Sequence, residues 1–119
     1  QLDPVELGRA VVHRYAYLTT ETVLALAGMI SQATHAYTFA SSLSKRVNVA
    51  GSTYLFRKLK DEYLYNPTGI EVKDGVFIAS TERAVADMLY FNPRYHFDFI
   101  DSIDFEKVGR IQREIGYPC

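Results

Sequence analysis

The sequence contains a single cysteine, Cys119, and no excess of charge of either sign. One cysteine excludes an internal disulfide framework and a cysteine-rich zinc site, and it is typical of a reducing cytoplasm. Thirteen Lys and Arg residues against fourteen Asp and Glu residues leave a net charge of −1. The chain therefore lacks the strong basic excess of a free-standing nucleic-acid-binding protein, and any contact of that kind is expected to be local.

Long apolar runs are missing as well, because no segment approaches the roughly 18 apolar residues of a membrane-spanning helix, and no signal peptide opens the sequence. We therefore expect a cytoplasmic protein with no membrane contact. What is abundant is core material: 48% of the 119 residues are hydrophobic, with nine Tyr and seven Phe. This composition suits a single domain over residues 1–119. The first residue is Gln1 rather than Met, which is compatible with a piece of a longer chain.

The stretch from Val76 to Phe91 combines a strand, a helix cap and an amphipathic helix without a linker. Ser80 is expected to cap the helix, because its hydroxyl can accept a hydrogen bond from a backbone N–H of the first turn. Glu82 then lies where the helix dipole favours an anion. Arg83 and Asp87 are four residues apart and are predicted to form a pair on the helix surface, worth only a few tenths of a kcal/mol.

Apolar periodicity and capping residues predict three further helices. They run from Asp3 to about Arg14, from Thr19 or Thr20 to Gly28, and from Ser102 or Asp104 to Gly116. Between them, residues 35–41 alternate as a half-buried strand does.

Turn signals predict two hairpins. In the first, Val47 and Val49 pair with residues 54–59 across Gly51-Ser52, in a type II′ turn. In the second, Ile70 and Val72 pair with Val76 and Ile78 across Asp74-Gly75, in a type I′ turn. Residues 61–68 are expected to be a connection, and residues 94–101 fit either a short strand or an aromatic loop. The prediction is an α+β domain with about five mostly antiparallel strands and four helices.

Chemical motifs are mostly absent. The sequence has no GxxxxGK[ST] or GxGxxG phosphate loop, no HExxH and no GxSxG. His13, His35 and His96 are far apart and have no Cys or carboxylate at ligand spacing, so no metal site, cofactor or catalytic residue is predicted. Glu82 and Asp87 are the remaining acid/base candidates. Five positions separate them by roughly 140° around a helix axis, which favours a first-turn Glu and a structural Asp.

Basic residues cluster on or beside the first predicted hairpin. They are Lys45, Arg46, Arg57, Lys58 and Lys60. Alternation would place Arg46, Asn48 and Arg57 on one face of the hairpin. There they could meet phosphate, the carboxylates of a protein partner or only water.

Two segments resemble motifs of the AbiEi family of antitoxins. Residues 17–28, YLTTETVLALAG, are similar to S-Y-[IL]-S-x-x-S-A-L-x-x-H-G, and residues 79–89, ASTERAVADML, are similar to A-T-P-E-[KR]-A-[LI]-x-D-L-[LI]. A strand, a basic loop, a hairpin and a further strand between them follow the family's order, so the resemblance covers about residues 3–91. Two positions depart from the pattern, since Thr81 replaces the usual proline and Ala27 stands where a histidine is common.

The resemblance implies the C-terminal domain of a non-enzymatic antitoxin and transcriptional regulator in a type IV toxin–antitoxin, or abortive-infection, system of phage defence. It implies a functional link to a nucleotidyltransferase-like toxin. It also implies that promoter DNA is bound through an N-terminal winged helix, but no such domain can be fitted to the residues before Tyr17. A homo-oligomer is compatible with the resemblance. The family-motif positions are Ser80, Glu82, Arg83 and Asp87. The alternative function is a degenerate nucleotidyltransferase-like or nuclease-like enzyme that uses Glu82 and Asp87.

Overall fold

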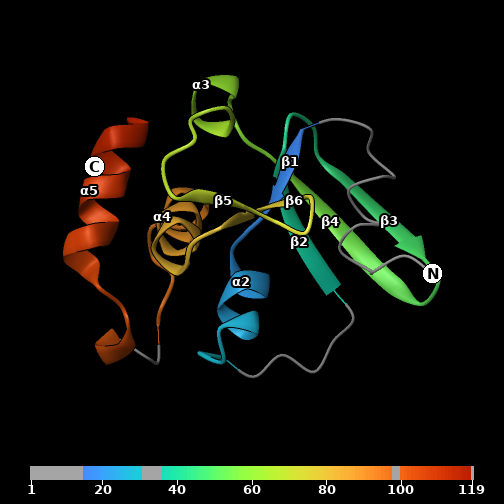
Figure 1. Ribbon diagram of the computed structural model, residues 1–119, viewed down its shortest axis with the longest axis horizontal. Helices are drawn as coiled ribbons and strands as arrows, with labels where there is room; N and C mark the ends of the chain where they lie inside the picture. Colours follow the sequence, from blue (N-terminus) through green and yellow to red (C-terminus); the bar gives the residue numbers. More distant parts are fainter. Residues whose placement is uncertain (1–14, 31–35, 98–99, 119) are drawn as a thin grey trace.

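The computed structural model describes residues 15–30, 36–97 and 100–118, and these residues form one six-stranded sheet and four α-helices (Figure 1). In chain order the elements are β1 (Ala16–Leu18), α2 (Glu21–Leu26), β2 (Ala36–Ser41), β3 (Lys45–Val49), β4 (Ser52–Lys58), α3 (Asp61–Leu64), β5 (Ile70–Lys73), β6 (Val76–Ala79), α4 (Thr81–Phe91), a 3₁₀ turn (Ile100–Ser102) and α5 (Phe105–Ile115). The predicted α+β class is confirmed. The helix predicted over residues 3–14 lies outside the described residues.

The sheet is mixed, with the order β3-β4-β2-β1-β6-β5. Three neighbouring pairs are antiparallel, whereas β1 with β6 and β2 with β4 are parallel. The sheet has six strands rather than the predicted five or so, and three of its five pairs are antiparallel, in line with the prediction of mostly antiparallel strands. The missed strand is β1, a central strand whose three residues are at most 1% exposed. A short strand that is buried on both faces shows no alternation of apolar and polar residues, which is why the sequence pattern did not reveal it.

The two hairpins differ in how well the sequence predicted their turns. Lys73 pairs with Val76, and both Asp74 and Gly75 have positive φ, as a type I′ turn requires. In the first hairpin Val49 pairs with Ser52, so the turn residues are 50 and 51 and both have positive φ. The predicted type II′ turn at Gly51-Ser52 was therefore wrong by one residue. The observed register keeps the buried alternate residues of β4, Tyr54 and Phe56, on one face of the sheet, and this register fixes where the turn lies.

Helix ends follow the predicted caps in α4 and α5. The Ser80 hydroxyl accepts a hydrogen bond from the Arg83 backbone N–H at 3.1 Å, and Asp104, rather than Ser102, caps α5 by accepting from the Lys107 N–H at 3.1 Å. Gly116 ends α5 in the left-handed conformation. The helix predicted to begin at Thr19 or Thr20 is α2, which ends slightly before Gly28, and its N-cap makes no side-chain hydrogen bond.

Two connections were predicted less well. Residues 61–68 contain a short helix, α3, that the sequence pattern did not indicate. Residues 94–101 form no strand in their described part. No helix in the described ranges is both long and apolar enough to cross a membrane.

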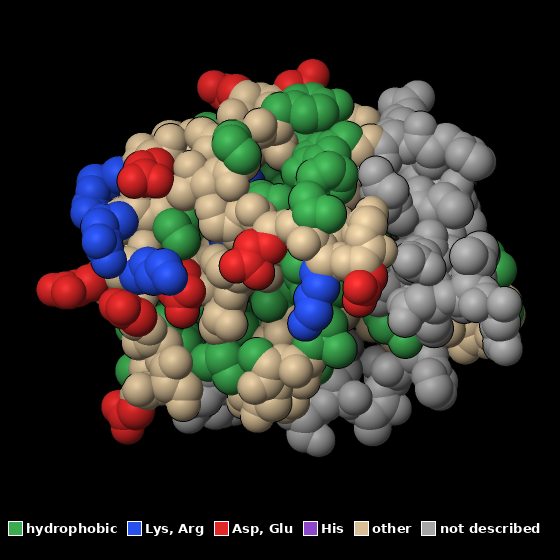
Figure 2. Space-filling model, viewed as in Figure 1, with side chains coloured by type: hydrophobic (Ala, Val, Ile, Leu, Met, Phe, Trp, Pro, Cys, Tyr) green, Lys and Arg blue, Asp and Glu red, His purple; other side chains and the backbone are tan. Residues whose placement is uncertain are grey.

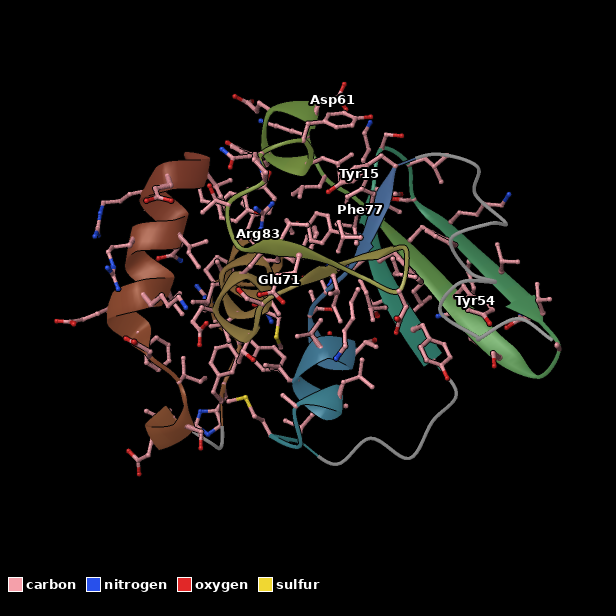
Figure 3. All side chains as sticks on the ribbon, in the orientation of Figure 1. Tyr15, Tyr54, Asp61, Glu71, Phe77 and Arg83 are labelled. Carbon is pink, nitrogen blue, oxygen red and sulfur yellow. The ribbon has the colours of Figure 1, made fainter. Side chains whose placement is uncertain are left out.

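Aromatic rings fasten the sheet to its neighbours. The ring centre of Tyr15 lies 4.9 Å from that of Phe77 in β6 (Figure 3). It lies 5.4 Å from the ring centre of Tyr65, which follows α3. Within the sheet, Phe39 stacks on Phe56 across the parallel strands β2 and β4. On the helical side, α4 packs against both α2 and α5, so α4 is enclosed by the fold.

The cap of α4 makes a first testable prediction. Ser80→Ala removes the acceptor of the Arg83 N–H, so the free energy of unfolding is expected to fall by about 1 kcal/mol and the melting temperature by several degrees. The matched control is Ser102→Ala, which removes an exposed hydroxyl from the candidate cap that α5 does not use. Thermal melts of the two variants beside the parent chain test the assignment. Equal melting temperatures for Ser80→Ala and Ser102→Ala would contradict it.

Candidate functional site

The motif residues Arg83 and Asp87 form a buried ion pair on α4. The Arg83 Nε donates to Asp87 Oδ1 at 3.2 Å, and both side chains are 0% exposed. The prediction of a surface pair was therefore wrong. Its physical reason lies in the environment of α4, in which six consecutive residues, 83–88, are buried. Over these residues the helix has no solvated face on which a charged pair can lie.

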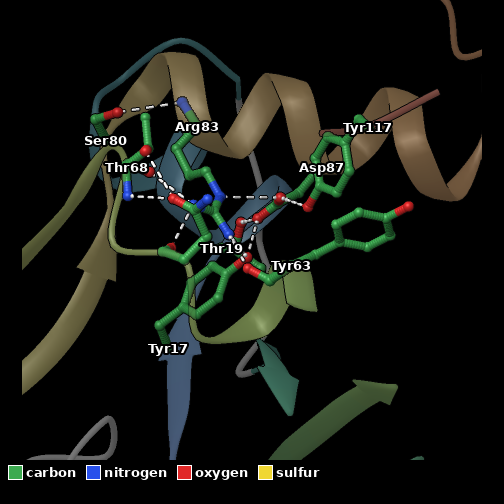
Figure 4. A network of polar contacts seen from close by, with 9 residues as sticks. Tyr17, Thr19, Tyr63, Thr68, Ser80, Arg83, Asp87 and Tyr117 are labelled. Atoms are coloured by element: carbon green, nitrogen blue, oxygen red, sulfur yellow. Dashed lines mark hydrogen bonds and ion pairs between the residues drawn. The ribbon is translucent and has the colours of Figure 1, made fainter. Parts of the chain in front are cut away.

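The guanidinium group of Arg83 donates all of its hydrogen bonds to other residues of the fold (Figure 4). Its Nη1 donates to the carbonyl oxygens of Asn66 at 2.9 Å and Thr68 at 2.6 Å. Its Nη2 donates to the carbonyl oxygen of Tyr63 at 3.0 Å and to the Tyr17 hydroxyl at 3.0 Å. With Nε on Asp87, all five N–H donors of a guanidinium group are accounted for. Arg83 thus holds the connection between α3 and β5 against α4.

Both carboxylate oxygens of Asp87 also accept hydrogen bonds. Its Oδ2 accepts from the Tyr17 hydroxyl at 2.7 Å and from the Thr19 hydroxyl at 2.7 Å. Its Oδ1 accepts from Arg83 and from the Tyr117 hydroxyl. The four donors come from β1, the residue after β1, α4 and the segment after α5. We call these five side chains, Tyr17, Thr19, Arg83, Asp87 and Tyr117, the buried polar network.

The network keeps its protons in fixed places. Burial, followed by the charge of Asp87, raises the pKa of Tyr17, and the same two causes raise the pKa of Tyr117. Both hydroxyls therefore stay protonated and remain donors to the carboxylate. Burial lowers the pKa of Arg83, but Tyr17 and then Asp87 outweigh that effect and raise it, so the guanidinium keeps its charge.

Glu82 lies in a different setting from Asp87. Its carboxylate is 3.4 Å from the Lys107 Nζ of α5, with side chains 20% and 51% exposed. It therefore fastens α4 to α5 at the surface, while Asp87 is sealed inside, and the structure does not give the two carboxylates a common partner. No group of three or more His, Cys, Asp or Glu side chains in the described part of the chain could hold a metal ion.

The predicted basic residues do gather in space, and all five are exposed. Lys45 and Arg46 begin β3, Arg57 and Lys58 end β4, and Lys60 precedes α3. Because β3 and β4 are antiparallel, with Lys45 opposite Phe56, the beginning of one strand lies beside the end of the other. The cluster therefore occupies the end of the hairpin farthest from its turn.

These cations do not share one role or one face. The Arg57 guanidinium lies 4.0 Å from the ring centre of Phe91, at the end of α4. The register places Arg46 and Arg57 on one face of the sheet and Lys45 and Lys58 on the other. Among the described residues, Lys45, Arg46, Lys58 and Lys60 make no ion pair.

Sequence reasoning missed Tyr17, Thr19 and Tyr117 as members of the buried polar network. Tyr17 and Thr19 carried one usable signal, since residues two apart in an extended chain point to the same side. Tyr117 carried none, because it follows the predicted end of the last helix. Its position is fixed by stacking on Tyr90, with ring centres 4.6 Å apart.

Comparison of the chain with models of protein families, with curated proteins and with solved structures found no match. The fold itself defines an α+β domain with one mixed six-stranded sheet. Its function has to be inferred from its own residues.

Proposed function

We propose that this chain is a non-enzymatic domain that acts by binding, as an antitoxin and transcriptional regulator of the AbiEi type in a type IV toxin–antitoxin system. The observation that carries the proposal is the direct contact between the two segments that resemble the family. Tyr17 and Thr19 of residues 17–28 both donate to Asp87 of residues 79–89. A family that shared this contact would need both segments to keep their polar residues.

The hydrogen bonds that Asp87, the carboxylate of the second family-like segment, already accepts support a role without catalysis. A general base has to come within hydrogen-bond reach of its substrate, and a metal ligand has to offer a free lone pair. Asp87 is 0% exposed and already accepts four hydrogen bonds. Glu82 pairs with Lys107 on another side of the helix. The enzyme alternative would require this network to come apart before any chemistry.

The regulatory proposal assigns the remaining functions to partners. A nucleotidyltransferase-like toxin is the functional counterpart, promoter DNA is bound through a winged helix elsewhere, and the exposed cations around β3 are the surface available for contact. The proposed setting is the cytoplasm. No cofactor is required.

A survival assay tests the proposal. Cells express a nucleotidyltransferase-like toxin encoded beside this chain, together with the parent chain or with Glu82→Gln. We expect the variant to protect as well as the parent, because the amide can still lie against α5 and nothing is catalysed. The enzyme alternative predicts a loss of several orders of magnitude when a catalytic carboxylate becomes an amide.

Thermal melts accompany the assay, so that a folding defect is not mistaken for a catalytic one. Asp87→Asn is scored only with its melt, since its effect on stability is expected to dominate. Lost protection from a Glu82→Gln variant that melts like the parent would contradict the absence of catalysis. Failure of the parent chain itself to protect would contradict the antitoxin role.

A further inference from the structure

The strand β3 forms one outer edge of the sheet, and its only neighbour in the described chain is β4. Every second residue of an edge strand points its backbone N–H and C=O groups away from the sheet. Such a row of unpaired groups is a template for another extended chain. The opposite edge, β5, is shorter and carries both Glu71 and Lys73, so the two edges differ in charge.

The positively charged side chains lie along the β3 edge and point to both faces of the sheet. Lys45 points to one face of the sheet and Arg46 to the other. Lys58 ends the neighbouring strand β4, and Lys60 follows two residues later. The cations of α5 are arranged differently, since Figure 2 shows Lys and Arg side chains interspersed with Asp and Glu side chains over that helix. Among the described residues, the cations on or beside the β3 edge make no ion pair, and of the four only Lys60 is followed directly by acidic residues.

We propose that the β3 edge binds an extended acidic segment of a partner protein by β-strand addition. In this mode main-chain hydrogen bonds supply affinity and the alternation of side chains supplies specificity. An added strand sends successive side chains to opposite faces. Acidic residues at neighbouring positions then meet Lys45 on one face and Arg46 on the other, while Lys58 and Lys60 add attraction from farther away.

The same geometry disfavours other occupants. A nucleic-acid duplex laid on one face of the hairpin meets only the cations of that face, and the chain as a whole carries a net charge of −1. A second copy that paired its own β3 in parallel register would bring like charges together across the new ladder. An antiparallel pair centred on Val47 would place Lys45 opposite Val49 and Arg46 opposite Asn48, so it would give these cations no acidic partner. Charged side chains on an edge also disfavour pairing with an uncharged strand, because they would lose water without gaining a partner. This edge therefore favours an acidic segment.

A peptide titration tests the proposal on the 119-residue chain. The probe is a fluorescent peptide that repeats Glu-Glu-Thr-Thr, so that neighbouring glutamates point to both faces of an added strand. Its matched control has proline in place of every threonine. The control keeps the charge but loses the backbone donors at every proline. At low ionic strength we expect the glutamate-threonine peptide to bind at least about tenfold more tightly than the control.

Variants assign the binding to the edge. The double variant Lys45→Glu with Arg46→Glu is expected to weaken the glutamate-threonine peptide by at least about tenfold. The control is Lys73→Glu on the opposite edge strand, which is expected to leave its affinity nearly unchanged. All three side chains are exposed, and a thermal melt of each variant confirms that the fold is kept.

Three results would overturn the proposal. Equal binding of the two peptides would show attraction by charge alone, tighter binding of a short duplex DNA would show a nucleic-acid surface, and no binding of the glutamate-threonine peptide would show a solvated edge. The inference does not depend on the regulatory function. Protection against a toxin that persists without peptide binding would remove only the edge proposal.

Discussion

Asp87→Asn is expected to lower the free energy of unfolding by about 3–5 kcal/mol, the usual cost of removing one partner from a buried ion pair. The two side chains have nearly the same shape, so no cavity forms and the loss is electrostatic. Arg83 would keep its charge in a site that is 0% exposed without the carboxylate beside it. The new amide group would also point N–H donors at hydroxyls that now donate to Asp87.

The measurement is chemical denaturation of the parent and the variant at neutral pH. Because a domain of this size has a total stability of about 5–15 kcal/mol, the expected loss is a large fraction of the whole. Glu82→Gln is the matched control, since it makes the same chemical change on the same helix at a partly exposed site. We expect it to cost no more than about 1 kcal/mol.

A small effect of Asp87→Asn would contradict the account of the network as a closed and fully bonded unit. The same result would also favour the enzyme alternative, because a carboxylate that the fold does not need would be available for another purpose. Stability of the two amide variants therefore separates a structural Asp87 from a functional one without any assay of activity.

Gly69→Ala is expected to cost about 2–4 kcal/mol, from a strained backbone and an overpacked site together. Gly69 has a φ of +73°, which a residue with a Cβ rarely adopts. A Cβ there would lie 2.9 Å from the Cβ of Arg83 and 3.2 Å from the Oγ of Ser80. The glycine cannot retreat easily, because its carbonyl oxygen accepts the Ser80 backbone N–H at 2.8 Å.

Two other glycines separate the strain from the contact. Gly51 and Gly75 also have positive φ, but a Cβ at either position meets nothing within 4 Å. Their alanine variants are expected to lose only about 1 kcal/mol from the backbone. Urea midpoints of the three variants give the comparison. If Gly69→Ala were no worse than Gly51→Ala, the segment before β5 would have to move freely past α4, against the hydrogen bonds that hold it.

The elements that the sequence predicted correctly are those with local causes. Ser80 and Asp104 cap helices through a backbone N–H three residues away, and Asp74-Gly75 makes its turn from two adjacent residues with positive φ. Each of these signals lies within a few residues of the feature that it causes. The first hairpin shows the limit of such reasoning, since its turn lies one residue from the predicted place. There the burial of side chains along the whole strand sets the register, and the turn residues follow from it.

The sequence by itself determined the caps of α4 and α5, the second hairpin, the α+β class and the exposure of the basic residues near β3. Only the tertiary structure decided that β1 is a central strand and that Arg83 and Asp87 are buried. The physical reason is the distance along the chain between the groups involved. Tyr17 lies 70 residues from Asp87, and Tyr117 lies 30 residues away on the other side. A charged pair is stable inside a protein only where such distant donors converge on it, and no local pattern of residues records that convergence.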